Sequence, residues 1–162
     1  MWRSEGRFWK VGTFQWVNNM DNTKEKLTIS FYKNGIATTT LTYDEITDEV
    51  TVSERVEEVE ISVGELREWI QGASVWRNEI WSLVKKPELS TNKYDVDIKK
   101  NPSSGVVELK IQVDGVNFGT KWKKNTNAMT LKVRNEVVIA PIELDFMIRH
   151  YTEFLKVIET YD

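Results

Sequence analysis

The stretch Val59-Glu-Ile-Ser-Val-Gly-Glu-Leu-Arg-Glu-Trp-Ile70 is matched 78 positions later by Val137-Val-Ile-Ala-Pro-Ile-Glu-Leu-Asp-Phe-Met-Ile148. In both stretches an apolar strand end runs directly into the first turn of a helix. Identical residues occupy five equivalent positions, which are 59/137, 61/139, 65/143, 66/144 and 70/148. An internal repeat determines the architecture of a chain, so this match predicts two copies of one structural unit.

A β-hairpin is repeated upstream, at an offset of 80 positions. Asn34-Gly35 corresponds to Asp114-Gly115, and both dipeptides favour a tight hairpin turn because their residues tolerate positive φ. Apolar residues alternate around the two turns, at Leu27, Ile29, Phe31 and Ile36 in the first and at Val107, Leu109, Ile111 and Val116 in the second. The hairpin therefore belongs to the repeated unit.

Each copy closes with an amphipathic helix. Ser62-Val-Gly-Glu65 has the form of a capping box, and Pro141 suits a first helical position because its missing N–H costs nothing there. We expect the first helix to end at Lys85 and Lys86, before Pro87. Apolar residues recur at helical spacing, at Leu66, Trp69, Ile70, Ala73, Trp76, Ile80 and Val84, and at Met147, Tyr151, Phe154, Leu155 and Ile158.

These patterns predict an α+β fold in which four antiparallel strands and one helix occur twice in tandem (ββββα-ββββα), with pseudo-two-fold symmetry. Residues 1–162 would form a single domain built from half-repeats 1–86 and 91–162. Residues 7–17 read as one long strand, and residues 129–140 read as another. Residues 50–62 read as one strand or two short ones.

The composition excludes several classes of site and protein. The chain has 162 residues and no cysteine, so disulfides, thiolate nucleophiles and cysteine-held zinc are excluded. Its first residues lack the apolar stretch of a signal peptide, and no run approaches the roughly 18 apolar residues of a membrane span. We therefore expect a soluble, cytoplasmic protein that does not bind membranes.

Charge is distributed unevenly, although the net charge is only -3. Residues 43–69 hold ten acids and two bases, whereas residues 99–134 hold eight bases and two acids. A local excess of one sign indicates a surface that attracts partners of the opposite sign. The alternative is that both segments are ordinary solvated surface.

Strand alternation assigns the charges to faces. In the second half, Val107, Leu109, Ile111, Val113, Val116, Phe118, Thr120 and Trp122 would face the helix, with Leu131, Val133 and Ile139 in the last strand. The opposite face would then carry a cationic cluster around Gly119, formed by Lys110, Lys121, Lys123, Lys132 and Arg134. The outer face of the first half would be neutral, with Thr28, Ser30, Tyr32, Ala37, Thr39, Leu41 and Tyr43.

Aromatic residues complement these cations. Tyr32, Trp9 and Trp16 are the candidate stacking platforms, with Trp9 and Trp16 on opposite faces of the first strand. Cations for phosphates together with rings for bases are the components of a single-strand nucleic-acid site. The other reading is an ordinary solvated antiparallel sheet.

Catalytic signatures are sparse. His150 is the only histidine in the chain, and no phosphate loop or Ser/His/Asp set occurs. Asp95 and Asp97 share a strand face and could hold Mg²⁺ as in a nuclease, but Lys93 and Lys99 nearby favour ion pairing. We expect a non-enzymatic protein with no metal and no cofactor.

The tandem of strands and helix resembles the Whirly-like single-strand-binding superfamily, which includes the Whirly proteins, the purine-rich-element-binding proteins, the mitochondrial guide-RNA-binding proteins and the positive cofactor four coactivators. The resemblance lies in the last strand that runs into an amphipathic helix, at residues 59–70 and 137–148. The Lys-Gly-Lys type motif of the Whirly proteins is absent, and Gly119-Thr-Lys-Trp-Lys-Lys124 is a loose substitute. The resemblance implies binding of ssDNA or RNA across the strands, no catalysis, and assembly into dimers or tetramers.

The leading hypothesis is therefore non-enzymatic binding of single-stranded DNA or RNA, through Lys110, Lys121, Lys123, Lys132, Arg134, Tyr32, Trp9 and Trp16. The alternative is a protein-interaction or assembly module, in which the acidic surface of residues 43–69 meets the basic surface of residues 99–134 in another copy. A metal-dependent nuclease that uses Asp95 and Asp97 is a third hypothesis.

Overall fold

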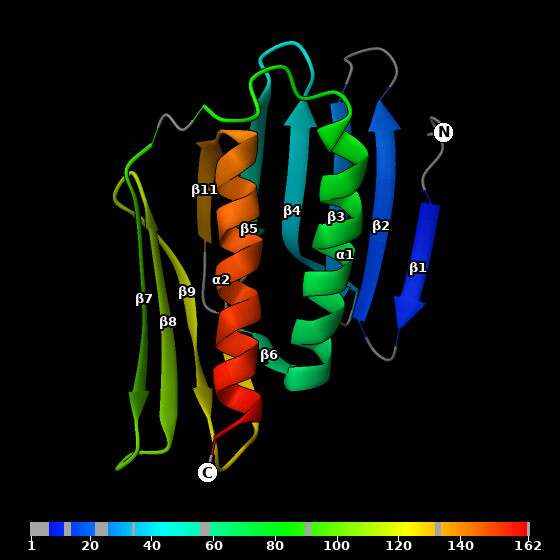
Figure 1. Cartoon of the computed structure of the whole chain (residues 1–162). Coiled ribbons are helices and arrows are strands. Elements are labelled where there is room, and N and C mark those ends of the chain that lie inside the picture. The colour runs from blue at the N-terminus through cyan, green and yellow to red at the C-terminus, as the bar shows by residue number, and fades with distance from the viewer. Residues whose placement is uncertain are drawn as a thin grey trace.

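The computed structural model describes residues 7–11, 14–21, 26–33, 35–55, 59–89, 92–131 and 134–161. These residues form an α+β fold with two antiparallel sheets and two helices (Figure 1), which confirms the predicted class at this level.

One sheet has six strands in the order β1-β2-β3-β4-β5-β11, and the other has five in the order β6-β10-β9-β8-β7. The six-stranded sheet consists of β1 (Arg7–Val11), β2 (Phe14–Asp21), β3 (Lys26–Lys33), β4 (Ile36–Asp44), β5 (Glu49–Arg55) and β11 (Arg134–Ile139). The five-stranded sheet consists of β6 (Val59–Ser62), β7 (Tyr94–Asn101), β8 (Val106–Val113), β9 (Val116–Lys123) and β10 (Ala128–Leu131).

Each sheet takes one strand from the far part of the chain. β6 follows β5 in sequence but pairs with β10, and β11 follows β10 but pairs with β5. The strand expected over residues 129–140 is therefore two strands in different sheets. The strand expected over residues 7–17 is likewise two, because β1 and β2 form a hairpin. In the described part of the chain six strands precede the first helix and five lie between the two helices, rather than the expected four each.

The helices α1 (Val63–Trp81) and α2 (Pro141–Glu159) lie side by side (Figure 1). Helix α1 packs against β2 and β3 of the six-stranded sheet and against β6, whereas α2 packs against β5 and against β7 and β8 of the five-stranded sheet. The capping box is present at α1: the Ser62 hydroxyl accepts from the Glu65 amide at 3.1 Å, and the Glu65 carboxylate accepts from the Ser62 amide at 2.9 Å. Pro141 is the first residue of α2, as predicted. Local sequence therefore sets both helix starts.

The first helix ends at Trp81, four residues before the expected Lys85. The reason is a competing acceptor in the turn between β4 and β5. The Asp48 carboxylate accepts from the Lys85 amide at 3.1 Å and from the Lys86 amide at 3.0 Å. The Tyr43 hydroxyl also donates to Asp48, at 2.7 Å. These amides are therefore bound by a side chain instead of extending the helix.

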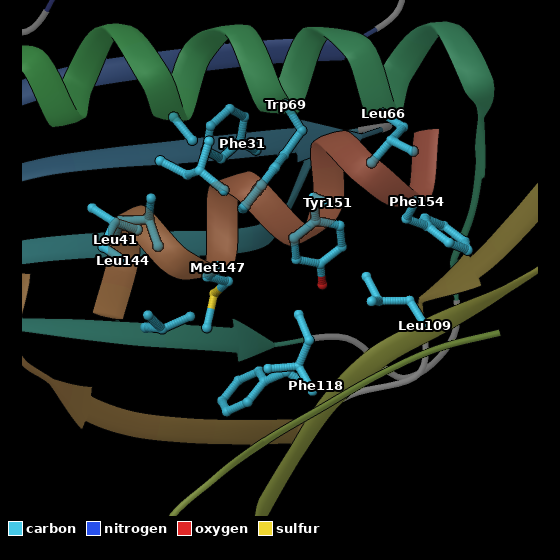
Figure 2. Packing of buried hydrophobic residues seen from close by; sticks show 14 of the residues in the cluster. Phe31, Leu41, Leu66, Trp69, Leu109, Phe118, Leu144, Met147, Tyr151 and Phe154 are labelled. Carbon is cyan, nitrogen blue, oxygen red and sulfur yellow. The ribbon is translucent and has the colours of Figure 1, made fainter. Parts of the chain in front are cut away.

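One cluster of buried residues draws on both sheets and both helices. Trp69 of α1 and Tyr151 of α2 lie next to each other in its centre, with ring centroids 4.7 Å apart (Figure 2). The predicted stripes are buried at Leu66, Trp69, Ala73, Trp76 and Ile80 in α1 and at Met147, Tyr151, Phe154, Leu155 and Ile158 in α2. Of the other two predicted positions, Ile70 is half-buried and Val84 lies beyond the end of α1. Trp122 is also a core residue.

A β-bulge distinguishes the first hairpin from the second. The register of β3 and β4 shifts between Phe31 and Tyr32: Tyr32 is opposite Ala37 but Phe31 is opposite Thr39, so Thr38 is the extra residue. The Thr38 hydroxyl is buried and donates to the Phe31 carbonyl at 3.1 Å. A one-residue shift moves every following side chain to the other face. The prediction that Thr39, Leu41 and Tyr43 face outward is therefore wrong, and all three are buried.

The outer face of the six-stranded sheet is instead a ladder of hydroxyls. Thr28 and Thr42 face each other with their hydroxyl oxygens 3.2 Å apart, and the Ser30 and Thr40 oxygens are 3.1 Å apart. Thr28, Ser30, Tyr32 and Ala37 are half-buried, as expected for a strand face that packs against its own neighbours.

Candidate nucleic-acid interface

The face of the five-stranded sheet turned away from the helices, here called the outer face, follows the predicted alternation. The inward residues of β8 and β9 are buried except Val116, which is half-buried. Lys110, Lys121 and Lys123 are exposed on the opposite side. A period of two in these strands therefore predicted both the core and the exposed lysines.

A carboxylate lies among these lysines. In the ladder Glu108 is opposite Lys121, Lys110 is opposite Gly119, and Val106 is opposite Lys123. The Lys121 ammonium is 4.0 Å from the Glu108 carboxylate, and the two side chains are 61% and 27% exposed. Exposed pairs at this distance contribute little and are screened by salt, so Lys121 remains able to exchange Glu108 for another anion.

Further carboxylates lie at the margins of the outer face. Asp95 and Asp97 are exposed on β7, and Glu60 is exposed on β6. These two strands are the edges of the sheet. The central strands β8 and β9 thus carry three outward lysines and one outward glutamate, and acids border them on both sides.

Cations concentrate at the end of the sheet where the β7–β8 and β9–β10 turns lie, here called the lysine end. Its members are all exposed: Lys99, Lys100, Lys121, Lys123 and Lys124. Lys100 and Lys124 approach Tyr161 after α2, with their ammonium groups 4.6 and 5.3 Å from the centre of its ring. The Tyr161 ring contacts Trp122 edge-on, with centroids 5.3 Å apart. These contacts hold the two lysine stems on the helix side of the lysine end, opposite the outer face.

Sequence reasoning missed Lys100 and Lys124 as site residues and assigned Lys99 to ion pairing. The sequence feature that indicates these site residues is the pair of lysine doublets, Lys99-Lys100 and Lys123-Lys124. Each doublet ends a strand next to a turn, and the two strands are separated only by β8 in the sheet. Strand alternation sends the two members of a doublet to opposite faces, so a prediction confined to one face omits one of them.

The structure separates Arg134 from the lysines, so the prediction of five cations on one sheet face is wrong. Arg134 lies in β11, opposite Arg55 in the six-stranded sheet. The reason is the passage of the chain from one sheet to the other between β10 and β11. Lys132 lies outside the described residues.

The predicted stacking platforms do not join the lysines either. Tyr32 is half-buried on the six-stranded sheet. Trp9 and Trp16 are register partners across the β1–β2 hairpin, rather than positions of one strand with opposite faces. The side chains of Trp9 and Trp16 lie outside the described part. Among the described aromatic residues, Tyr161 is the ring that contacts the lysine end.

The acidic segment presents fewer charges than its composition suggests. Glu54 and Glu65 are both buried. Glu65 belongs to the capping box and pairs with the Lys33 ammonium at 2.5 Å, while Asp48 binds the backbone after α1. These carboxylates therefore do not form the acidic docking surface of the alternative hypothesis.

Glu54 is a buried carboxyl with an unusual environment. It points inward from β5, and its Oε1 atom has no hydrogen-bond partner. A cavity of about 20 Å³ adjoins it, lined by Thr39, Glu54, Ile61, Leu66, Trp69, Thr120, Met129 and Tyr151. No cation lines that cavity, so burial raises the pKa of Glu54 to about 8. Burial also raises the pKa of the neighbouring Tyr151 hydroxyl, with the Glu54 charge adding to it.

The structure explains why position 119 is occupied by glycine, which the sequence alone does not show. Its φ is +156°, and a Cβ atom there would overlap the Leu109 carbonyl oxygen and lie 3.2 Å from the Leu109 carbonyl carbon. The close approach that requires glycine is therefore that of strand β8.

No family model matches the chain, and neither a curated protein nor a solved structure matches it. Among the described residues no group of three or more His, Asp or Glu side chains could hold a metal ion. Asp95 and Asp97 are exposed, opposite Gln112 and Lys110. Neither described helix is both long enough and apolar enough to cross a membrane.

Proposed function

We propose that the protein binds single-stranded DNA or RNA without catalysis, along the outer face of the five-stranded sheet. The observation that supports this most directly is the row of exposed lysines on its central strands, Lys110, Lys121 and Lys123, with the lysine end beside them. Lys121 and Lys123 are two residues apart on one strand, which spaces their Cα atoms by roughly 7 Å. Successive phosphates of an extended single-stranded nucleic acid are separated by a similar distance.

The shape of the site favours a single strand over a duplex. Duplex sequence is read by an element that enters a groove, usually a helix or a two-stranded ribbon. Here the lysines lie on a sheet face that no described element overlies. A broad basic face can track the flexible backbone of a single strand.

We infer that the chain is a single pseudo-symmetric domain built from half-repeats 1–86 and 91–162. The series β2-β3-β4-β5-β6-α1 parallels the series β7-β8-β9-β10-β11-α2 in order. The exchange of β6 and β11 between the sheets is reciprocal, as a two-fold relation requires. The extra residue Thr38 accounts for one of the two positions by which the offset between the halves falls, from 80 at the hairpin to 78 at the strand and helix that close each half. Such a duplication accords with the resemblance to the Whirly-like superfamily.

We expect the Lys121→Ala/Lys123→Ala double variant to bind a single-stranded oligonucleotide of about 30 nucleotides more weakly, with a shallower salt dependence. Each phosphate contact on a single strand contributes about 0.7 to the slope of log K against log salt, so losing two lowers the slope by about 1.4. Fluorescence anisotropy at several salt concentrations, with a duplex for comparison, measures both quantities.

The matched control is Lys86→Ala/Lys156→Ala, which removes the same charge from exposed positions after α1 and on α2, outside the outer face. The control is expected to retain the wild-type slope. Equal slopes for both double variants contradict the assignment of Lys121 and Lys123. Absence of salt-dependent binding in the wild type contradicts the function itself.

A further inference from the structure

The strand β7 forms a free edge of the five-stranded sheet. It is eight residues long, and within the described part of the chain it pairs only with β8. Figure 1 shows it as the outermost strand at the left of the molecule. Such an edge presents a row of unpaired backbone groups that can accept another strand.

The hydrogen-bonding pattern of the β7–β8 ladder determines which backbone groups of β7 point to the free edge. The Asp114 amide donates to the Lys93 carbonyl at 2.8 Å, and these residues continue the register in which Tyr94 is opposite Val113. In an antiparallel ladder hydrogen-bonded and non-hydrogen-bonded pairs alternate. Asp95, Asp97 and Lys99 therefore bond to β8. The backbone groups of Tyr94, Val96, Ile98 and Lys100 are directed to the free edge.

The side chains of this edge carry charges in a self-complementary order. Asp95, Asp97 and Lys99 are exposed on the outer face. Val96 and Ile98 are only half-buried on the inner side, where they pack against the core. A partner strand at this edge would cover the remaining apolar surface of both residues.

We propose that a second copy of this chain docks here, with the two β7 strands antiparallel about a two-fold axis at Ile98. In this register Asp97 is opposite Lys99 of the second copy, and Lys99 is opposite its Asp97. Ile98 meets Ile98 on the inner side, and Val96 meets the apolar stem of Lys100. The residues whose backbone groups are directed to the free edge are then opposite each other, as hydrogen bonding between the two strands requires.

Neighbouring registers place like charges directly opposite each other. Moving the axis to position 99 places Lys99 opposite Lys99 and leaves Asp97 opposite Asn101. Moving it to position 97 places Asp97 opposite Asp97, while Asp95 is opposite Lys99. Like charges directly opposite each other in a ladder are destabilising. Charged residues on an edge generally prevent pairing with unrelated strands. The order Asp95, Asp97, Lys99 therefore disfavours pairing of β7 with unrelated strands but allows antiparallel pairing with β7 of a second copy.

Such a dimer has one continuous sheet of ten strands, five from each copy. A two-fold axis perpendicular to the sheet leaves both outer faces on the same side. Since Lys99 and Lys100 lie next to Ile98, the two lysine ends flank the axis. The dimer does not depend on the proposed nucleic-acid function, but it would join two lysine ends into one longer basic surface.

Sedimentation equilibrium of the full chain without nucleic acid, over a wide concentration range at low and moderate salt, tests the proposal. The wild type is expected to form dimers that weaken as salt rises. Asp97→Lys and Lys99→Asp each replace two attractive pairs by two repulsive ones, so each is expected to raise the dimer dissociation constant at least about tenfold. The double variant Asp97→Lys/Lys99→Asp restores both pairs and is expected to restore the dimer.

Glu136→Lys provides the control, because it reverses a charge on β11, the edge strand of the other sheet. It is expected to leave the dimer unchanged, and circular dichroism confirms that each variant is folded. A wild type that stays monomeric at all concentrations overturns the proposal. A dimer that survives both single reversals, or a folded double variant that stays monomeric, overturns the interface.

Discussion

Replacing Gly119 by alanine is expected to lower the free energy of unfolding by on the order of 3 kcal/mol. The new Cβ atom would overlap the carbonyl oxygen of Leu109 and lie 3.3 Å from the Lys110 Cα atom. Both are backbone atoms of a central strand, so they cannot move aside as a flexible side chain would. The φ of +156° adds strain for any residue with a Cβ atom. Urea denaturation followed by circular dichroism measures the loss.

Gly115→Ala is the matched control for this prediction. Gly115 also has a positive φ, +82°, but nothing lies within 4 Å of the position that its Cβ atom would occupy. Only the conformational cost remains, about 1 kcal/mol. Equal losses for the two variants would show that backbone overlap with β8 does not restrict position 119.

The protein is expected to lose stability as the pH rises from about 4.5 to about 8, because of Glu54. Burial raises the pKa of this carboxyl from 4.5 to about 8 in the folded state, so the folded protein binds a proton that the unfolded chain releases. A group with a raised folded pKa contributes its full stability below the unfolded pKa and loses it as the pH passes the folded pKa. A difference of this size corresponds to on the order of 5 kcal/mol.

The Glu54→Gln variant keeps the shape of the side chain but cannot ionise. Its free energy of unfolding relative to the wild type is expected to increase steadily between pH 4.5 and pH 8 and to level off above. Urea titrations at pH 5, 7 and 9 give this difference. Glu136→Gln, an exposed acid on β11, is the control and is expected to show no such trend. Parallel pH profiles for Glu54→Gln and the wild type would contradict ionisation of Glu54 as the cause.

Part of the candidate site followed from the sequence. The sequence places Lys110, Lys121 and Lys123 on the exposed face because inward residues alternate along each strand, from Val107 to Val113 and again from Val116 to Trp122. Arg134 was misplaced because the same alternation says nothing about which sheet a strand joins. Lys100 and Lys124 were missed because their position depends on Tyr161, which lies at the far end of the chain.

The bulge at Thr38 illustrates why one hairpin was predicted correctly and the other was not. Both hairpins carry the same turn signal, and the second keeps its alternation on both strands. In the first hairpin Thr38, Thr39 and Thr40 are identical in chemistry, so no local preference reveals which of them is the extra residue. The burial of Leu41 and Tyr43 selects the bulged register.

The sequence by itself determined the α+β class, the two helix starts, the buried helical stripes and the exposed lysines of β8 and β9. Capping, proline at a first helical turn and side-chain periodicity all act within a few residues, so they can be read locally. The tertiary structure alone decided the exchange of β6 and β11, the bulge, the burial of Glu54 and the separation of Arg134 from the lysines. These features arise from pairing between strands that are distant in the chain, and no local pattern records which partner a strand will find.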